Sequence, residues 1–397
     1  MELKLDPNVS YALALEGGGA RGAYQIGAWR ALRQAGIRIA AAAGTSVGAL
    51  NGGVIAVGDY DLAAELWENI SYSQVIEADD DVMHSLMSGE ISLSNIKELL
   101  GHVGQVIKNR GFDVTPLRNM LRKYVPEDAV RASDVELFIV TTSLSDGGEE
   151  LELRARDLGD GELADMLMAS AYLPVFKAEK LGGKRYADGG FRDVLPLHVL
   201  IENGYKNIIA IRLYGTGIER AVRIPRDTQV ITVEPSDELG GTLEFEAENA
   251  RRNMRLGYFD TMRLLYGLRG KKYFIDIDCQ EDDARALLAR SALRVGAENG
   301  WSLRAVHEKL LPELAERADA EKGDYRDILA AALEEAADHI GLDRWKIYAE
   351  TELLSAVAAR GPSTGSWAPW RRRCERPRRR NRRCPGPGRR GGSWPNR

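Results

Sequence analysis

The stretch YALALEGGGARGAYQIGAWRALRQAGIRIAAAAGTSVG, residues 11–48, decides the fold. It opens with a short apolar strand that runs into three consecutive glycines. Apolar residues at helical spacing follow and end at Gly36, after which residues 37–43 can form a second buried strand. A tight turn over residues 44–48 then leads into a helix with small side chains. Strand, helix and strand in this order predict a mainly parallel α/β sheet.

The rest of the chain extends this pattern and then changes to helices. Further strands are predicted at residues 135–142, 150–154, 185–187, 207–213, 229–233 and 273–277. Residues 281–358 have an almost wholly helical pattern. We therefore predict a three-layer α/β/α fold with a mainly parallel central sheet, followed by a helical C-terminal region. The predicted boundaries are 1–280 for the α/β domain, 281–360 for the helical region and 361–397 for a basic tail.

Composition restricts the class of protein. The content of 44% hydrophobic and 28% charged residues is typical of a soluble globular protein. The N-terminal residues lack a signal-peptide pattern, and no apolar run approaches the roughly 18–20 residues of a spanning helix, so we expect a cytoplasmic protein with at most peripheral membrane contact. The three cysteines, Cys279, Cys374 and Cys384, have neither the number for a disulfide framework nor metal-ligand spacing. The sequence predicts no metal and no cofactor.

The net charge of −5 combines two unlike parts. Residues 361–397 hold twelve arginines, no lysine and one glutamate, or +11, so the first 360 residues carry −16. The segment has no Leu, Ile, Val, Met, Phe or Tyr, and we expect it to be disordered because it cannot bury a core. Anionic phospholipid and nucleic acid are both electrostatic partners for it in principle, but no specific nucleic-acid partner is predicted. The preferred interpretation is a solvated extension or an altered reading frame.

Gly44-Thr45-Ser46-Val47-Gly48 is a G-x-S-x-G motif between a predicted strand and a predicted helix. In that setting the motif forms a nucleophile elbow, which presents the serine hydroxyl at a helix N-terminus. The alternative is a glycine-rich connection with an ordinary serine. The context favours Ser46 as a nucleophile.

The loop Gly17-Gly18-Gly19-Ala20-Arg21-Gly22 also matches the dinucleotide-binding pattern G-x-G-x-x-G. That pattern needs an acid about twenty residues later, but no Asp or Glu lies between Glu16 and Asp59. The Gly-Lys-Ser/Thr of a phosphate-binding P-loop is missing too. An oxyanion hole is the better use, because the N–H groups of glycines can approach a tetrahedral intermediate closely. Its candidate residues are Gly17, Gly18, Gly19, Arg21 and Gly22.

The serine needs a base. None of the five histidines lies in a recognisable site motif. His198 could complete a triad order after Ser46 and Asp188, but it begins a predicted helix, and a packed histidine is the preferred interpretation. Asp188 ends a predicted strand and precedes two glycines, which places its carboxylate at the edge of the sheet where α/β proteins assemble their sites. The alternative is an ordinary Asp-Gly turn.

Together these motifs resemble the patatin-like phospholipase family of bacterial type. The family pattern is a G-G-G-x-R/K-G loop, a G-x-S-x-G elbow and a D-G-G/A box, which match Gly17–Gly22, Gly44–Gly48 and Asp188–Gly190 in order. Residues 169–174, ASAYLP, resemble the family's A-S-x-x-x-P stretch. The resemblance spans roughly residues 10–215. One departure is Val194, which stands where the family often has Asn, although Pro196 is kept.

The resemblance implies a serine esterase of the phospholipase A type, with residues 1–280 as its catalytic domain. It implies a Ser46–Asp188 dyad without a catalytic histidine, an oxyanion hole around Gly18 and Gly19, and a phospholipid or related acyl ester as substrate. Asp188 must then be partly desolvated, because a carboxylate with its usual pKa is a poor base. Residues 83–107 could cover an acyl groove or form an internal helix. The alternative function is an inactive module on the same fold that binds lipid or nucleotide head groups.

Overall fold

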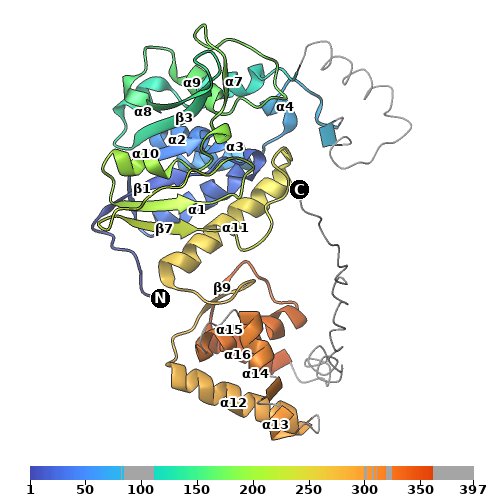
Figure 1. The fold of residues 1–397 in the computed structure, drawn as a ribbon. Coiled ribbons are helices and arrows are strands. Elements are labelled where there is room, and N and C mark those ends of the chain that lie inside the picture. The colour runs from blue at the N-terminus through green and yellow to red at the C-terminus, as the bar shows by residue number, and fades with distance from the viewer. Residues whose placement is uncertain are drawn as a thin grey trace, which may run out of the picture. The chain divides into compact units, whose positions relative to one another are not determined.

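The computed structural model describes residues 1–81, 83–84, 111–298, 302–305, 308–309, 311–318 and 324–360 (Figure 1). The chain divides into two compact units. The first contains Met1–Asp276 and Asp343–Tyr348, and the second contains Ile277–Leu342 and the described residues from Ala349 on. The basic tail predicted over 361–397 lies outside the described residues, as does the cover predicted over 83–107 apart from Met83 and His84.

The first unit is built on a seven-stranded sheet with the order β4-β3-β2-β1-β6-β7, in which β5 also pairs with β3. Its strands are β1 Ser10–Leu15, β2 Arg38–Thr45, β3 Glu136–Ser143, β4 Glu149–Arg154, β5 Tyr186–Asp188, β6 Asn207–Ile211 and β7 Gln229–Val233. The neighbours along β3-β2-β1-β6-β7 are parallel, whereas β4 and β5 run antiparallel to β3. The predicted mainly parallel sheet is confirmed, and each predicted strand is present within two residues of its predicted bounds.

A two-stranded sheet pairs β8, Phe274–Asp276, with β9, Ile347–Ala349. The predicted helical C-terminal region is confirmed, and β9 is a short interruption of the almost wholly helical stretch predicted over 281–358. Three residues are too short to show a period of two, and β9 exists because β8 lies beside it. Contact between the rings of Tyr273 and Tyr348, with centroids 6.4 Å apart, joins the same two segments.

Helices cover both faces of the large sheet and make up most of the second unit. The helices of the first unit are α1 Ala23–Gln34, α2 Val47–Val57, α3 Tyr60–Glu68, α4 Tyr72–Val75, α7 Thr115–Tyr124, α8 Glu127–Ala132, α9 Leu163–Ser170, α10 Leu197–Glu202 and α11 Ala247–Tyr266, with single 3-10 turns at Gly19–Gly22, Ala155–Asp157 and Gly189–Phe191. Those of the second unit are α12 Glu281–Glu298, α13 Leu303–Ala305, α14 Leu311–Ala318, α15 Tyr325–His339 and α16 Glu350–Arg360. Within the described part of the chain, no helix has the length and apolar character needed to cross a membrane.

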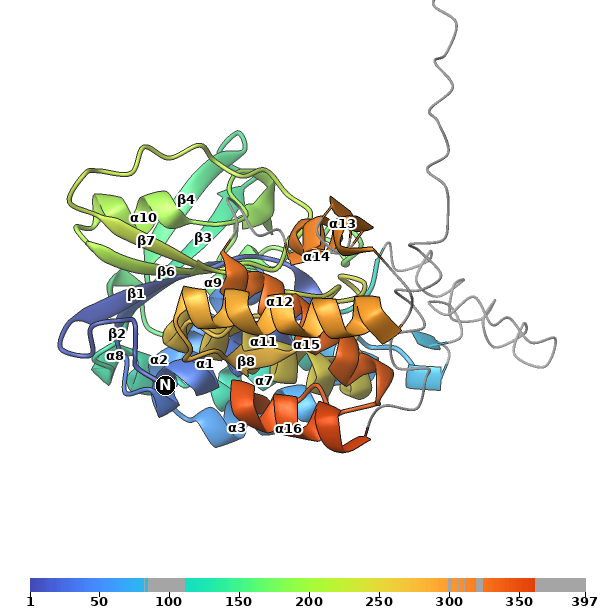
Figure 2. The ribbon, with the colours of Figure 1, turned by 90° about the horizontal axis from the view of Figure 1, so that it is seen from below.

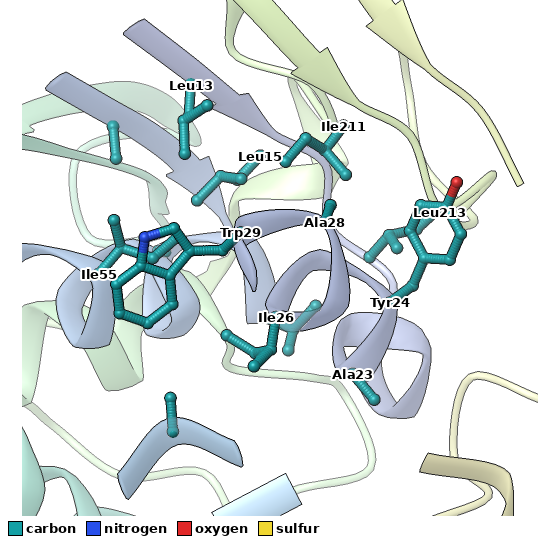
Figure 3. Close-up of a cluster of buried hydrophobic side chains, with 14 of the residues drawn as sticks. Leu13, Leu15, Ala23, Tyr24, Ile26, Ala28, Trp29, Ile55, Ile211 and Leu213 are labelled. Atoms are coloured by element: carbon teal, nitrogen blue, oxygen red, sulfur yellow. The ribbon is translucent and has the colours of Figure 1, made fainter. Parts of the chain in front are cut away.

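The side chains of β1 point alternately to the two faces of the sheet and so contribute to two cores. Leu13 and Leu15 point into the larger core, where they meet α1 and α2 (Figure 3). Ala12 and Ala14 face the opposite side of the sheet and pack in a second core with residues of α10. A sheet buried on both faces needs a helical layer on each, so the predicted three-layer α/β/α fold is confirmed.

Helices α1 and α11 lie in close contact in the first unit (Figure 2). The contact depends on Gly27 and Gly257. A Cβ atom on Gly27 would lie 1.9 Å from the carbonyl oxygen of Met254, and one on Gly257 would lie 2.0 Å from that of Tyr24. The two backbones therefore touch, and α1 is held in place directly after the glycine loop that precedes it.

Candidate active site

The elbow consists of one residue between a strand and a helix. β2 ends at Thr45, α2 begins at Val47, and Ser46 between them has φ 54° and ψ −128°. Among the described non-glycine residues, only Ser46 and Tyr214 have a positive φ. Gly48 approaches the end of the neighbouring strand β1 so closely that a Cβ atom on it would lie 2.2 Å from the carbonyl oxygen of Leu15. The G-x-S-x-G motif therefore forms a strained, tightly packed turn that presents Ser46 at the N-terminus of α2.

The strand β3 brings Ser46 and Asp188 together. In its register, Val140 pairs with Thr45 at the end of β2, and the next residue, Thr141, pairs with Asp188 at the end of β5. Because β2 runs parallel to β3 and β5 runs antiparallel to it, the two strands meet end to end along the same side of β3. Residues 142 positions apart in the chain thus become neighbours at the carboxyl edge of the parallel sheet.

Asp188 is buried, with 6% of its surface exposed. Its Oδ1 accepts a hydrogen bond of 2.8 Å from the Gly190 N–H, whereas Oδ2 has no hydrogen-bond partner among the described residues. Burial raises the pKa of Asp188 to about 6, although the Ser46 hydroxyl and the Gly190 N–H act in the opposite direction. Among the described residues no hydrogen bond joins the Ser46 hydroxyl to Asp188, and catalytic hydrogen bonds are often long in unliganded sites.

Ser170 holds the backbone of the elbow. The Ser46 N–H donates a hydrogen bond of 2.9 Å to Ser170 Oγ, and the Ser170 hydroxyl donates one of 2.6 Å to the carbonyl oxygen of Val140. Ser170 is completely buried. The only sequence signal for this serine is the A-S-x-x-x-P stretch, because its contact with Ser46 crosses 124 residues of chain.

The glycine loop uses some of its N–H groups and leaves others open. The Gly17 N–H donates to the carbonyl oxygen of Val194 at 2.9 Å. For the N–H groups of Gly18 and Gly19, the described residues offer no hydrogen-bond acceptor. Gly19 lines the same cavity as Ser46. Val194, which departs from the family pattern, holds Gly17 through a backbone carbonyl that any residue can supply.

Arg21 and Gly22, the other predicted oxyanion-hole residues, hold the loop in place. The Arg21 guanidinium donates to the carbonyl oxygens of Gly240 at 2.8 Å and Tyr214 at 2.6 Å. Gly22 packs against α2, and a Cβ atom on it would lie 2.4 Å from Val47 Cγ2. Their contacts shape the loop from two sides.

Glu16 is a site residue that none of the predicted motifs contains. It precedes the glycine loop and is 1% exposed. Its carboxylate accepts from Arg212 Nε at 2.9 Å and from the Leu213 N–H at 2.7 Å, so it fastens the segment after β6 against the loop. A buried carboxylate at a strand end beside a glycine run was the available signal, but its partner lies 196 residues away.

His198 lies in an ion cluster between β4 and α10. Its Nδ1 is 2.8 Å from Asp193 Oδ2, although not aligned for a hydrogen bond, and its Nε2 is 3.0 Å from Glu152 Oε1 and 3.2 Å from Glu150 Oε1. Burial disfavours the charged imidazole, but the neighbouring carboxylates prevail and raise the pKa of His198 above its usual value. These partners are the contacts of a packed histidine.

The same cluster has the composition of a cation site. One ligand atom each from Glu150, Glu152 and His198 lie within 4.8 Å of one another. The guanidinium of Arg220 lies 3.2 Å from Glu150 and 3.9 Å from Glu152 and already supplies positive charge there. The cluster therefore links β4 to the segments around it as an ion-pair network.

An apolar cavity of about 100 Å³ adjoins Ser46 and Gly19 and extends along α2. Its walls come from α2, α3, α4, α7 and the segment after α9, and Asn51 is its main polar lining residue. The amide of Asn51 is already engaged, since it donates to Gly22 O and Gln25 Oε1 and accepts from Trp67 Nε1. The other lining residues are Val47, Leu50, Val54, Ala63, Leu66, Trp67, Ile70, Val75, Leu117, Met120, Leu121, Tyr124, Val125, Ala171, Leu173, Phe176 and Phe245.

An α/β sheet with a strained serine, a buried carboxylate beside it and an apolar cavity is characteristic of the serine lipid hydrolases. Residues 13–201 match the sequence model of the patatin-like phospholipases. Residues 13–201 therefore form a patatin-like phospholipase domain, and such a domain implies lipid acyl hydrolase activity.

Several relatives share this region. An uncharacterised NTE family protein of Mycobacterium tuberculosis is 27% identical over 208 residues, which cover 52% of this chain and 49% of that protein, so the chain spans about half the length of this relative. Patatin-like phospholipase domain-containing protein 7 of Mus musculus is 30% identical over 207 residues, covering 50% of this chain and 13% of that protein. Among solved structures, VipD from Legionella pneumophila matches with a TM-score of 0.40 and 16% identity, covering 90% of this chain and 89% of that chain.

Proposed function

We propose that this protein cleaves carboxylic ester bonds of phospholipids or related acyl esters, with Ser46 as nucleophile and Asp188 as base. The observation that carries the proposal is the end-to-end meeting of β2 and β5 on β3, which sets a buried carboxylate beside a strained serine. A carboxyl group with a pKa of about 6 is mostly ionised at neutral pH and is a stronger base than an ordinary aspartate.

In the acylation step, Asp188 accepts the proton of the Ser46 hydroxyl while Oγ forms a bond to the carbonyl carbon of the ester. The carbonyl π electrons move onto oxygen, and a tetrahedral oxyanion results. When this intermediate collapses, the bond to the leaving alkoxide breaks and the alkoxide takes the proton from Asp188. The products are an alcohol and an acyl group bound to Ser46.

In the deacylation step, Asp188 accepts a proton from water as the water oxygen attacks the acyl carbon. The second oxyanion collapses, the bond to Ser46 Oγ breaks, and Oγ recovers its proton from Asp188. A carboxylic acid leaves and both residues return to their starting states.

The open N–H groups of Gly18 and Gly19 are proposed to stabilise both oxyanions. Removal of one such donor typically lowers kcat by about 10²–10³. The N-terminus of α2 adds partial positive charge at Ser46. In this proposal Glu16 and Arg21 act as positioning residues, because they hold the loop by its flanks.

The cavity supports an apolar acyl chain as the group that is bound. It begins at the proposed nucleophile and is lined almost wholly by aliphatic and aromatic side chains. A chain placed there leaves the ester carbon near Ser46 and the head group toward the carboxyl edge of the sheet.

Hydrolysis of a water-soluble short-chain ester and of a long-chain phospholipid tests the proposal. The wild type should cleave both, and Ser46→Ala and Asp188→Asn should each lose about 10³-fold or more of the rate. Asp227→Asn is the matched control, because Asp227 is exposed and pairs with Lys206 away from the site, so its rate should equal that of the wild type. His198→Gln should keep its rate per folded molecule even if it loses stability. A folded wild type that cleaves neither ester would instead favour a binding module.

A further inference from the structure

A surface groove lies beside β5. Tyr186 and Ala187 of this strand form part of its wall, and the opposite parts come from the segments after β3 and α9 and from Phe191. Leu173 and Phe176 line both this groove and the apolar cavity that adjoins Ser46. The groove and the cavity therefore share a wall, which Leu173 and Phe176 form.

Large apolar side chains stand exposed around the groove. Leu144 and Phe191 line it and are 55% and 48% exposed, and Val175, which lies between the lining residues Pro174 and Phe176, is 44% exposed. These three are isolated from one another in the sequence but gather on one surface. Exposed apolar side chains that gather on one surface mark a contact with a partner or a membrane.

A second segment extends the apolar surface. The Ile218 N–H donates a hydrogen bond of 2.9 Å to the carbonyl oxygen of Gly190, the residue before Phe191, and Ile218 is 58% exposed. The surface formed by Leu144, Val175, Phe191 and Ile218, which we call the apolar rim, thus adjoins the Asp188–Gly190 box.

The charge at the groove is positive, although the first 360 residues carry −16. Arg185 lines the groove, is exposed, and has no acidic partner among the described residues. The Arg192 guanidinium donates only to the carbonyl oxygen of Gly148, which leaves its charge uncompensated. The one carboxylate in the lining, Glu179, is paired with Arg118 at 2.7 Å. An apolar rim with two uncompensated arginines is complementary to a layer with an apolar interior and an anionic surface.

We propose that the apolar rim, with Arg185 and Arg192, is the face by which the protein docks on a surface of anionic phospholipid. Leu144, Val175 and Phe191 enter the acyl region, while the arginines contact phosphate groups. This inference deepens the proposed function and rests on it. Docking at this face would place the membrane against the wall that the groove shares with the cavity beside Ser46. Docking itself requires no chemistry at Ser46 and can be measured without it.

A fluorescent label placed in the rim tests the proposal separately from any binding by the twelve arginines of residues 361–397. The full chain carries Ser46→Ala, and its three native cysteines are replaced by serine, so that an environment-sensitive dye can be attached at Val175→Cys. The matched control carries the dye at Ile224→Cys, which is 47% exposed and lies five residues before β7 begins, near the amino edge of the parallel strands. Both proteins are mixed with vesicles of phosphatidylcholine alone or with added phosphatidylglycerol.

The dye at residue 175 should shift to the blue on vesicles that contain phosphatidylglycerol and be quenched by a quencher in the acyl region, whereas the dye at residue 224 should do neither. Adding Arg185→Glu should weaken the response at residue 175 by roughly tenfold in apparent affinity, and Phe191→Ala should reduce its blue shift. An unchanged dye at residue 175 on protein that sediments with the vesicles would overturn the proposal. A response only to an acidic polypeptide would overturn it in favour of a protein partner.

The two proposals fail in different ways. If the rim docks but the wild type does not cleave a water-soluble ester, the proposed chemistry is wrong and the docking surface stands. If the ester is cleaved but the rim does not respond to lipid, the docking surface is wrong and the chemistry stands.

Discussion

Replacement of Asp188 by asparagine should separate the stability of the protein from its activity. Asparagine has nearly the same shape, and its Oδ1 can still accept the hydrogen bond from the Gly190 N–H. What the substitution removes is a buried charge whose Oδ2 has no partner among the described residues. The protein should therefore lose its activity, and its stability relative to the wild type should rise with pH.

The magnitude follows from the pKa. The pKa of Asp188 is about 6 in the folded protein, compared with an ordinary value of 3.8 for aspartate. Between these two pH values the folded state holds a proton that the unfolded state has already released. Wild-type stability must therefore fall as the pH rises through this window and level off above it, where the buried charge costs about 3 kcal/mol. Asparagine does not titrate there. Relative to the wild type, the free energy of unfolding of Asp188→Asn should rise by about 1.5 kcal/mol between about pH 5 and pH 8.

Urea unfolding of both full chains, followed by tryptophan fluorescence across this pH range, provides the measurement. A buried amide N–H₂ without a partner shifts the variant's stability by a constant amount, so the dependence on pH is the quantity to compare. Asp227→Asn is the control, because Asp227 is exposed and its pKa is lowered, and its difference from the wild type should stay flat above about pH 5. A difference for Asp188→Asn that is constant or that shrinks with rising pH would refute the raised pKa.

Three further predictions concern the rate. The kcat/KM for a soluble ester should rise with pH and reach a plateau, with an apparent pKa of about 6, which is the pKa of Asp188. If this apparent pKa disappeared from the pH profile of His198→Gln, the base would be the histidine instead. Ser170→Ala leaves the Ser46 N–H without its acceptor and should lower kcat by about 10–100-fold with little change in KM. Ser170→Thr should restore much of the lost kcat. An unchanged kcat in folded Ser170→Ala would contradict the role of Ser170 in positioning Ser46. Val54→Trp fills the cavity beside α2 and should lower hydrolysis of long-chain esters far more than that of short-chain esters; an equal loss for both would place the acyl chain elsewhere.

The elbow and the glycine loop could be predicted from sequence because their geometry is local. The chain reverses within a few residues, and only certain residue types fit such turns, since a Cβ atom on Gly44 would lie 2.2 Å from the carbonyl carbon of Gly48. The predicted strands followed from buried apolar runs in the same way. The pairing of Ser46 with Asp188 was expected from family resemblance, and the register of β3 supplies a physical basis for it.

The supporting contacts could not be predicted from sequence. Ser170 is an ordinary serine until α9 places it under the elbow, and the carboxylate of Glu16 finds its partners only after β6 has paired with β1. β9 has three residues, too few for a period to appear, and forms where the chain returns to the first unit. Each of these features depends on segments that lie far apart in the chain.

The most direct test of the central claim is covalent labelling by a fluorophosphonate, which reacts with an activated serine. Peptide mapping by mass spectrometry should find one phosphonate adduct on Ser46 in the wild type, none in Ser46→Ala, and a labelling rate lowered by orders of magnitude in Asp188→Asn. Labelling of a different residue, or equally fast labelling of Ser46 when Asp188 is replaced, would contradict the account.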